Sequence, residues 1–129
     1  MLKKRTMVAQ YYTKRLSHLS GITLPHIQND RTTSWHLYVI KIDPHVLRIT
    51  RNAFIDALAK KGIHTSVHFI PLYRHPFYKK LLGHTPKEFP QSEWLYKRII
   101  SLPVYPSLKK KSIQYITTAI TKIVTNSKR

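Results

Sequence analysis

Cysteine is absent from the 129 residues of this chain. Its absence excludes disulfide bonds and any zinc or redox site built on thiolates. Long apolar runs are missing as well, since no stretch approaches the roughly 20 residues that span a bilayer. The basic start MLKKRTMVAQYY is not followed by the apolar region of a signal peptide. The sequence therefore predicts a soluble, cytoplasmic protein with no membrane partner.

Acidic residues are scarce, because five Asp and Glu face 23 Lys and Arg and leave a formal net charge of +18. Such an excess attracts polyanions, so a basic domain that binds nucleic acid or another polyanion is one hypothesis. The cations are scattered in short groups: Lys3-Lys4-Arg5, Lys60-Lys61, Lys79-Lys80 and Lys109-Lys110-Lys111. Scattered pairs and triplets are typical of a solvated face. Charge alone therefore leaves the polyanion hypothesis open as an alternative.

Glycine occurs only three times, and no glycine-rich phosphate loop is present. Apolar residues make up 42% of the chain, which suffices for the core of one domain. Hydrophobic periodicity and turn residues predict the following elements: a helix over 3–19, a strand over 34–42, a helix over 51–61, a strand over 63–69, a helix over 91–98, a strand within 99–106 and a last helix after 107. This order predicts a small two-layer α/β (α+β) fold with a three-stranded sheet flanked by helices.

Several local details can be predicted from the same patterns. The apolar run from Leu37 to Ile40 indicates a strand buried on both faces. Thr50 and Ser107 are suited to be the N-caps of the helices that follow them. In the helix over 91–98, Trp94 and Leu95 are expected to face inward. The last helix carries an apolar stripe: Ile113, Ile116, Ile120, Ile123 and Val124.

Histidines are concentrated in the stretch HTSVHFIPLYRHPFY, residues 64–78. On a strand, His64 and His68 would share a face but lie roughly 13 Å apart, too far for one metal ion. The helical zinc motif also requires a Glu where Thr65 stands. A metal site is therefore not expected. His36 and His68 are placed near strand ends, where loops commonly carry polar groups to a small ligand.

Three ordered segments carry a family resemblance: SWHLYVIKID, then RNAFIDALAKKGIHTSVHFIPLYRHPFY, then FPQSEWLYKRIISLPVYPSL. From about Arg5 to about Val124, the chain resembles the C-terminal small domain of the DegT/DnrJ/StrS aminotransferases. That family consists of pyridoxal-phosphate (PLP) enzymes that aminate keto sugars carried on nucleotides. The resemblance implies the fold of a type I aminotransferase, with residues 1–20 as the end of the interdomain connecting helix and 21–129 as the small domain.

The resemblance also implies a division of labour between two domains. The large domain of the family holds the Schiff-base lysine and most of the PLP site, and no lysine of this chain lies in that context. We therefore expect PLP in the complete enzyme, none bound to this chain alone, and no catalytic residue or activity in it. A truncated or split small domain with a separate large-domain polypeptide is the first hypothesis. Assembly of the chain into a homo-oligomer is also expected. An alternative to the split enzyme is a non-catalytic remnant that serves only in oligomerisation.

By position in the resembling motifs, His68 is expected on the substrate side of the site, near the cofactor and the nucleotide-linked sugar, and His36 at a second position close to the active site. The amino donor is a further expected partner of the complete enzyme. Tyr73 departs from the family, because many members carry histidine there. Tyr73 and His75 complete the substrate-side candidates. Substrate identity is expected to depend on the large domain.

Overall fold

Three short strands form the sheet: β1 (Ile22–Thr23), β2 (Tyr38–Ile42) and β3 (Ile99–Leu102). They pair antiparallel in the order β1-β2-β3, with Ile22 opposite Ile42 and Ile40 opposite Ile100. The computed structural model describes residues 1–128. The predicted α+β fold with a small three-stranded sheet is thus confirmed, but two of the three strands differ from the prediction.

The prediction of a strand over 63–69 is wrong, because this segment contributes only one bridge, between Ser66 and Ser101. The sheet instead gains β1, which lies in a segment that the sequence patterns assigned to a connection. The strand expected over 34–42 begins only at Tyr38. Its first residues cannot extend it, because Trp35 has a positive φ of 50°, a left-handed conformation incompatible with a strand.

Residues 1–128 also contain five α-helices: α1 (Leu2–Leu16), α2 (Arg51–Ala59), α3 (Pro76–Leu82), α4 (Pro90–Tyr96) and α5 (Lys110–Asn126), with 3-10 turns η1 (Leu72–Arg74) and η2 (Pro86–Glu88). Thr50 caps α2 as predicted, since its Oγ1 accepts from the Ala53 amide at 3.2 Å. Ser107 does not cap α5, because residues 105–108 form a turn and Lys109 occupies the N-cap. Within residues 1–128, the helices are too short or too polar to cross a bilayer.

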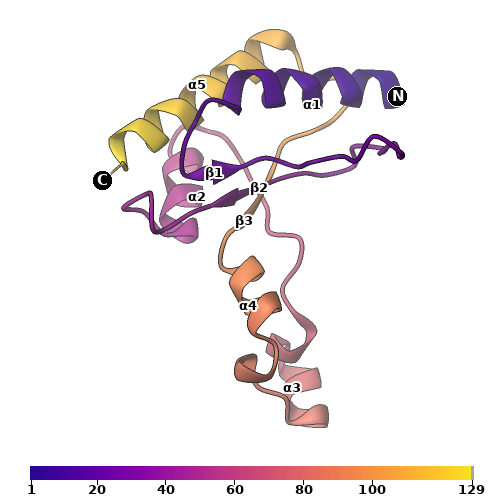
Figure 1. Ribbon diagram of the computed structural model, residues 1–129, viewed down its shortest axis with the longest axis vertical. Helices are drawn as coiled ribbons and strands as arrows, with labels where there is room; N and C mark the ends of the chain where they lie inside the picture. Colours follow the sequence, from indigo (N-terminus) through magenta and orange to yellow (C-terminus); the bar gives the residue numbers. More distant parts are fainter. Residues whose placement is uncertain (129) are drawn as a thin grey trace.

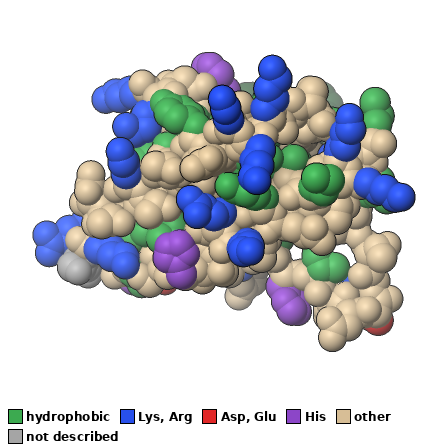
Figure 2. Space-filling model, turned by 90° about the horizontal axis from the view of Figure 1, so that it is seen from above, with side chains coloured by type: hydrophobic (Ala, Val, Ile, Leu, Met, Phe, Trp, Pro, Cys, Tyr) green, Lys and Arg blue, Asp and Glu red, His purple; other side chains and the backbone are tan. Residues whose placement is uncertain are grey.

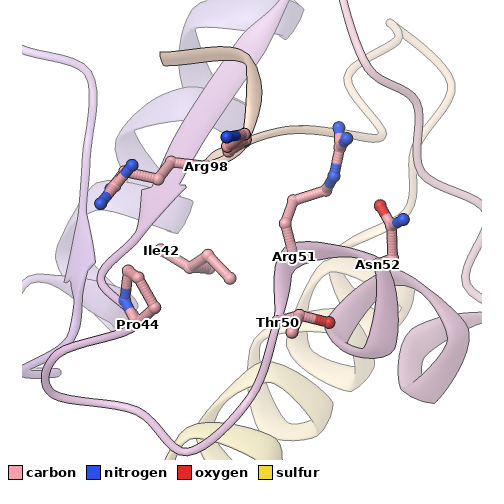
Figure 3. Close-up of a pocket in the computed structure, with 7 residues that line it drawn as sticks. Ile42, Pro44, Thr50, Arg51, Asn52 and Arg98 are labelled. Carbon is pink, nitrogen blue, oxygen red and sulfur yellow. The ribbon is translucent and has the colours of Figure 1, made fainter. Parts of the chain in front are cut away.

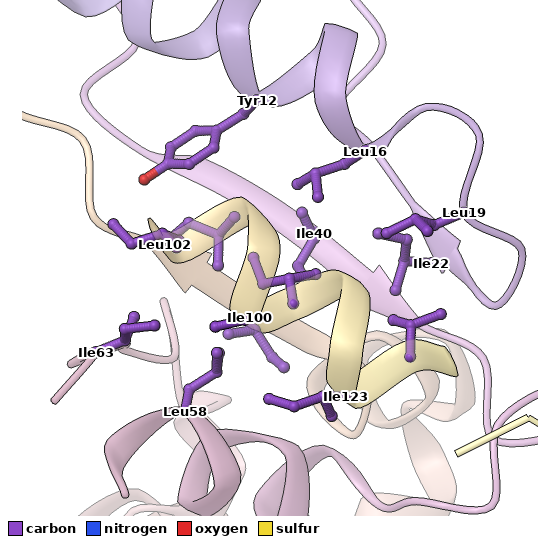
Figure 4. Packing of buried hydrophobic residues seen from close by; sticks show 14 of the residues in the cluster. Tyr12, Leu16, Leu19, Ile22, Ile40, Leu58, Ile63, Ile100, Leu102 and Ile123 are labelled. Carbon is purple, nitrogen blue, oxygen red and sulfur yellow. The ribbon is translucent and has the colours of Figure 1, made fainter. Parts of the chain in front are cut away.

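The hydrophobic core lies between the sheet and a layer formed by α1, α2 and α5 (Figure 1). Side chains from all of these elements meet there (Figure 4). The predicted stripe of α5 is buried in full. Burial on both faces of β2 is wrong: Tyr38, Ile40 and Ile42 are buried, whereas Val39 and Lys41 are only partly covered. A one-sided antiparallel strand explains this alternation.

Two close contacts position the connection between α1 and the sheet. Tyr12 on α1 is fully buried, and its hydroxyl donates to the carbonyl of Pro103 at 2.9 Å. Burial raises the pKa of the Tyr12 hydroxyl, with smaller contributions from neighbouring tyrosines. Gly21 follows α1 with a φ of 86°, and a Cβ built there would lie 2.6 Å from Leu47 side-chain atoms. Both observations explain why glycine stands at position 21.

An arm, defined here as residues 69–98, projects from the body of the molecule and carries α3 and α4 (Figure 1). Trp94 and Leu95, expected to face inward, are 46% and 42% exposed. Glu93 is buried in their place, at 7% exposure. The prediction failed because the inner side of α4 meets polar partners from elsewhere in the arm rather than the apolar core.

Candidate functional site

The face of β3 that points away from the core builds the candidate site. Ile100 and Leu102 face the core, so Ile99 and Ser101 point to the opposite side. Ser101 exchanges two backbone hydrogen bonds with Ser66, at 3.2 and 2.8 Å. These bonds bring the chain that follows Ser66 across the end of β3. Ile99 and Ser101 are buried as well, so all four residues of β3 are buried.

His68 lies over this face, and its Nδ1 is 2.9 Å from the Ser101 hydroxyl oxygen. Because Nδ1 is engaged, Nε2 is the ring nitrogen that remains for a ligand. The imidazole also makes an edge contact with Phe69, with ring centroids 4.8 Å apart. A half-buried histidine with one nitrogen held and one free is suited to orient a polar group of a bound molecule.

A cavity of about 410 Å³ opens beside His68. Its polar groups are the side chains of His68 and Ser92 and the Tyr96 hydroxyl. The other lining residues are apolar: Phe69, Ile70, Pro71, Leu72, Leu95 and Ile99. A largely apolar cleft with a few polar groups is the usual form of a small-molecule site. Its walls come from the base of the arm and from β3.

A carboxylate-centred network holds the two halves of the arm together. Glu93 on α4 accepts hydrogen bonds from the Tyr73 hydroxyl at 3.1 Å and from Arg74 Nη2 at 2.7 Å, and it also pairs with Arg74 Nε. The Arg74 guanidinium, followed by the Tyr73 hydroxyl, lowers the pKa of Glu93 to about 2 against the effect of burial. Tyr73 also stacks on Phe89 with centroids 4.8 Å apart. The network connects η1 to α4.

The structure places the four predicted substrate-side residues in different surroundings. His68 lines the cavity. Tyr73 is buried, and its hydroxyl is engaged by Glu93. His36 is exposed just before β2, and His75 is exposed just before α3. The cavity beside His68 is lined by none of the other three within the described chain.

Sequence reasoning missed two residues that the structure makes prominent, Glu93 and Arg51. Glu93 could have been singled out as one of only five acids, placed three residues after Pro90 in a first helical turn. Arg51 is buried, with its guanidinium 4.9 Å from the Tyr96 ring centre, and Arg74 lies 5.2 Å from the same centre. The periodicity of α2 offered no signal for it, because an arginine at a first helical position usually faces solvent.

No three His, Asp or Glu side chains gather in residues 1–128 as a metal site would require. The arrangement is instead a largely apolar cavity beside His68, carried by a small α+β domain.

Comparisons with known proteins identify that domain. The family model of the DegT/DnrJ/EryC1/StrS aminotransferases matches residues 1–121. The chain belongs to this family and has the fold of its C-terminal small domain.

The spore coat polysaccharide biosynthesis protein SpsC of Bacillus subtilis is 37% identical over 96% of this chain and 32% of its own length. The structure of PseC from Helicobacter pylori, an aminotransferase involved in the biosynthesis of pseudoaminic acid, has a TM-score of 0.87 and 26% identity. The match covers 97% of this chain and 33% of PseC. Spr1654 from Streptococcus pneumoniae, in its PLP form, matches with a TM-score of 0.87 and 26% identity over 98% of this chain and 32% of its own.

The chain spans about a third of the length of the curated relatives it matches. The family uses PLP, so the cavity beside His68 was tested for a fit to this cofactor. The cavity lining contains no lysine and no carboxylate among residues 1–128. PLP requires an amine for its Schiff base and a partner for its ring nitrogen. The cavity does not by itself fit PLP, and no step through the cofactor is derived from it.

Proposed function

We propose that this chain acts as the small domain of a PLP-dependent nucleotide-sugar aminotransferase and forms the sugar-facing wall of its active site. The observation that carries the proposal is the His68–Ser101 pair beside a largely apolar cavity. Family membership and the role of PseC in the biosynthesis of pseudoaminic acid support it. The lysine and the remaining PLP contacts are proposed to come from a large domain, and this chain alone is proposed to be inactive.

His68 is proposed to orient a hydroxyl of the sugar through Nε2. If the Ser101 hydroxyl donates to Nδ1, Nε2 carries the proton and donates to the substrate. If Nδ1 donates to Ser101, Nε2 accepts from the substrate instead. A sugar hydroxyl can take either role, so the pair fits both arrangements. PLP, when bound by the large domain, supplies the electron sink of transamination.

The exposed apolar residues of the arm support a partner surface. Their exposed fractions are large for side chains of this kind: Phe69 72%, Ile70 46%, Leu72 63%, Phe77 68%, Leu81 64% and Leu82 54%. Exposed apolar patches of this sort commonly mark contacts with another domain or subunit. We propose that the large domain covers this surface, and that a second copy in a homo-oligomer covers the rest of it.

A chimera tests the proposal: this chain replaces the matching third of PseC. Cofactor uptake is followed by the absorbance band near roughly 410–430 nm, and the amino-donor and sugar half-reactions are timed separately. His68→Phe is expected to slow the sugar half-reaction by about 100-fold and to leave the donor half-reaction within about 2-fold. His64→Phe, an exposed histidine outside the cavity, is the matched control.

Equal rates for the two variants would refute a role for His68. A chimera that takes up PLP and still cannot aminate a sugar would refute the assignment of this domain to the sugar-facing wall. Slowing of both half-reactions by His68→Phe would assign His68 to folding of the chimera instead of to the substrate.

Polyanion binding is the second candidate function, and the net charge of +18 is its only support. The distribution of the cations favours a charged surface without a binding patch. Figure 2 shows Lys and Arg side chains dispersed over the face that carries α1 and α5, rather than gathered in one patch. Nucleic-acid titration over a salt series would reveal a steep negative slope if this alternative held.

A further inference from the structure

A second cavity, also of about 410 Å³, lies at the start of α2 (Figure 3). Its lining residues come from three places in the chain: Ile42 at the end of β2 with Pro44 after it, Thr50, Arg51 and Asn52 at the start of α2, and Lys97 and Arg98 before β3. Three of these seven residues are cationic and none is acidic. This cavity shares no lining residue with the one beside His68.

The first turn of α2 presents free donors to this cavity. The Thr50 side chain satisfies the Ala53 amide, and the Phe54 amide bonds to the Thr50 carbonyl. The amides of Arg51 and Asn52 have no acceptor within residues 1–128. Unpaired amides at a helix start carry partial positive charge and bind anions.

Arg51 supplies an independent sign of a missing anion. Its side chain lines the cavity, yet the residue is only 9% exposed. Its Nε and Nη1 atoms are enclosed and have no hydrogen-bond partner in the described part of the chain. The Tyr96 ring beneath the guanidinium offers partial compensation. Burying a cation without an acceptor is costly, and an anion in the cavity would offset part of this cost through the charge of the guanidinium.

Within residues 1–128, no carboxylate fills this role for Arg51. The nearest candidate along the network, Glu93, is already engaged by Arg74 and Tyr73, and it also pairs with Lys97 Nζ at 3.6 Å. Arg98 donates to the carbonyl of Trp94 and stacks on its ring, which leaves its positive charge at the cavity wall uncompensated. The cavity therefore combines helix amides, a buried guanidinium and two further cations.

We propose that this cavity binds a phosphate group. The Arg51 and Asn52 amides and Nη2 of Arg51, the guanidinium nitrogen that is not enclosed, would hold the oxygens, while Lys97 and Arg98 balance the charge. A guanidinium and helix amides match a tetrahedral oxyanion in geometry as well as in sign. The group is either inorganic phosphate or the phosphate of an ester. The site is separate from the sugar-facing wall, so the phosphate proposal can be tested independently of the proposed function.

The test is a titration of the ¹⁵N-labelled chain with inorganic phosphate at constant ionic strength, followed by NMR. Saturable shifts are expected at the Arg51 and Asn52 amides. Arg51→Met is expected to weaken binding by at least about 10-fold. Arg15→Met removes the same charge from an exposed position on α1, outside the cavity, and is expected to change affinity by less than about 2-fold.

Asn52→Asp distinguishes a direct loss of phosphate binding from a loss caused by unfolding. An acid in the first turn stabilises a helix but repels an anion bound there. We expect weaker phosphate binding with an unchanged or higher melting temperature. A parallel titration with uridine diphosphate separates the sources: tighter binding than phosphate identifies an ester, and weaker binding identifies the free ion. Absence of saturable shifts, or equal weakening by Arg51→Met and Arg15→Met, would overturn the proposal.

Discussion

Replacing Glu93 by Gln tests whether the carboxylate network holds the arm closed. The amide keeps one oxygen for Tyr73 or Arg74, but its NH₂ group faces a guanidinium that can only donate. Hydrogen bonds to charged groups contribute roughly 1.5–3 kcal/mol each. Because the Arg74 side chain is 35% exposed and can regain water, we take a total loss of about 2 kcal/mol, at the low end.

A loss of this size raises the population of the opened arm by roughly 30-fold, since about 1.4 kcal/mol is a factor of ten. Limited trypsin digestion reports that population when cleavage is slow relative to closing. We expect cleavage at Lys79 or Lys80, on α3 in the arm, to accelerate by about that factor in Glu93→Gln. Asp56→Asn, an exposed acid on α2, is the matched control and should leave the cleavage rate unchanged.

The same network predicts how the stability of the chain changes with pH. The pKa of Glu93 is lowered from 4.5 to about 2 in the folded chain, first by Arg74. Its stabilisation is therefore complete above pH 4.5 and is lost as the pH falls toward 2. Denaturant unfolding should show a gap between wild type and Glu93→Gln at pH 6 that closes in this range. Cleavage rates within about 3-fold of each other, or a gap that ignores pH, would refute the reasoning.

Substitutions at three further positions test the body of the molecule by urea denaturation. Gly21→Ala should cost at least about 2 kcal/mol, because the positive φ and the contact with Leu47 both oppose a Cβ; an unchanged midpoint would contradict this. Thr50→Ala should cost about 1 kcal/mol through loss of the α2 cap, whereas Thr50→Ser should recover most of it. Tyr12→Phe should cost about 1 kcal/mol by leaving the Pro103 carbonyl unpaired, and a neutral result would imply that water replaces the hydroxyl.

Helices were predictable wherever local pattern and packing agree. The stripe of α5 and the Thr50 cap of α2 depend on residues three or four positions apart, and both predictions are confirmed. The strand expected over 63–69 failed for the opposite reason. Its β-branched residues favour an extended chain, but the segment leaves the sheet after the single pair of Ser66 and Ser101. Propensity indicates conformation and cannot indicate whether a partner strand is present.

The candidate site shows the same limit. The resemblance directed attention to His68, and the structure places it on a cavity wall. Its partner Ser101 lies 33 positions away in the chain, and the Glu93 network joins residues 19 and 20 positions apart. Contacts at such separations leave no periodic trace. Glu93 was overlooked because an acid in a short helix normally faces water, and only its tertiary partners justify its burial.

The pair of hydrogen bonds between Ser66 and Ser101 has an evolutionary consequence. It closes the base of the arm, so the chain leaves the body and returns to it at nearly the same point. Within residues 69–98, insertions, deletions and altered side chains can change the surface of the arm without touching the sheet or the helical layer beneath it. The body can therefore remain constant while the arm diverges.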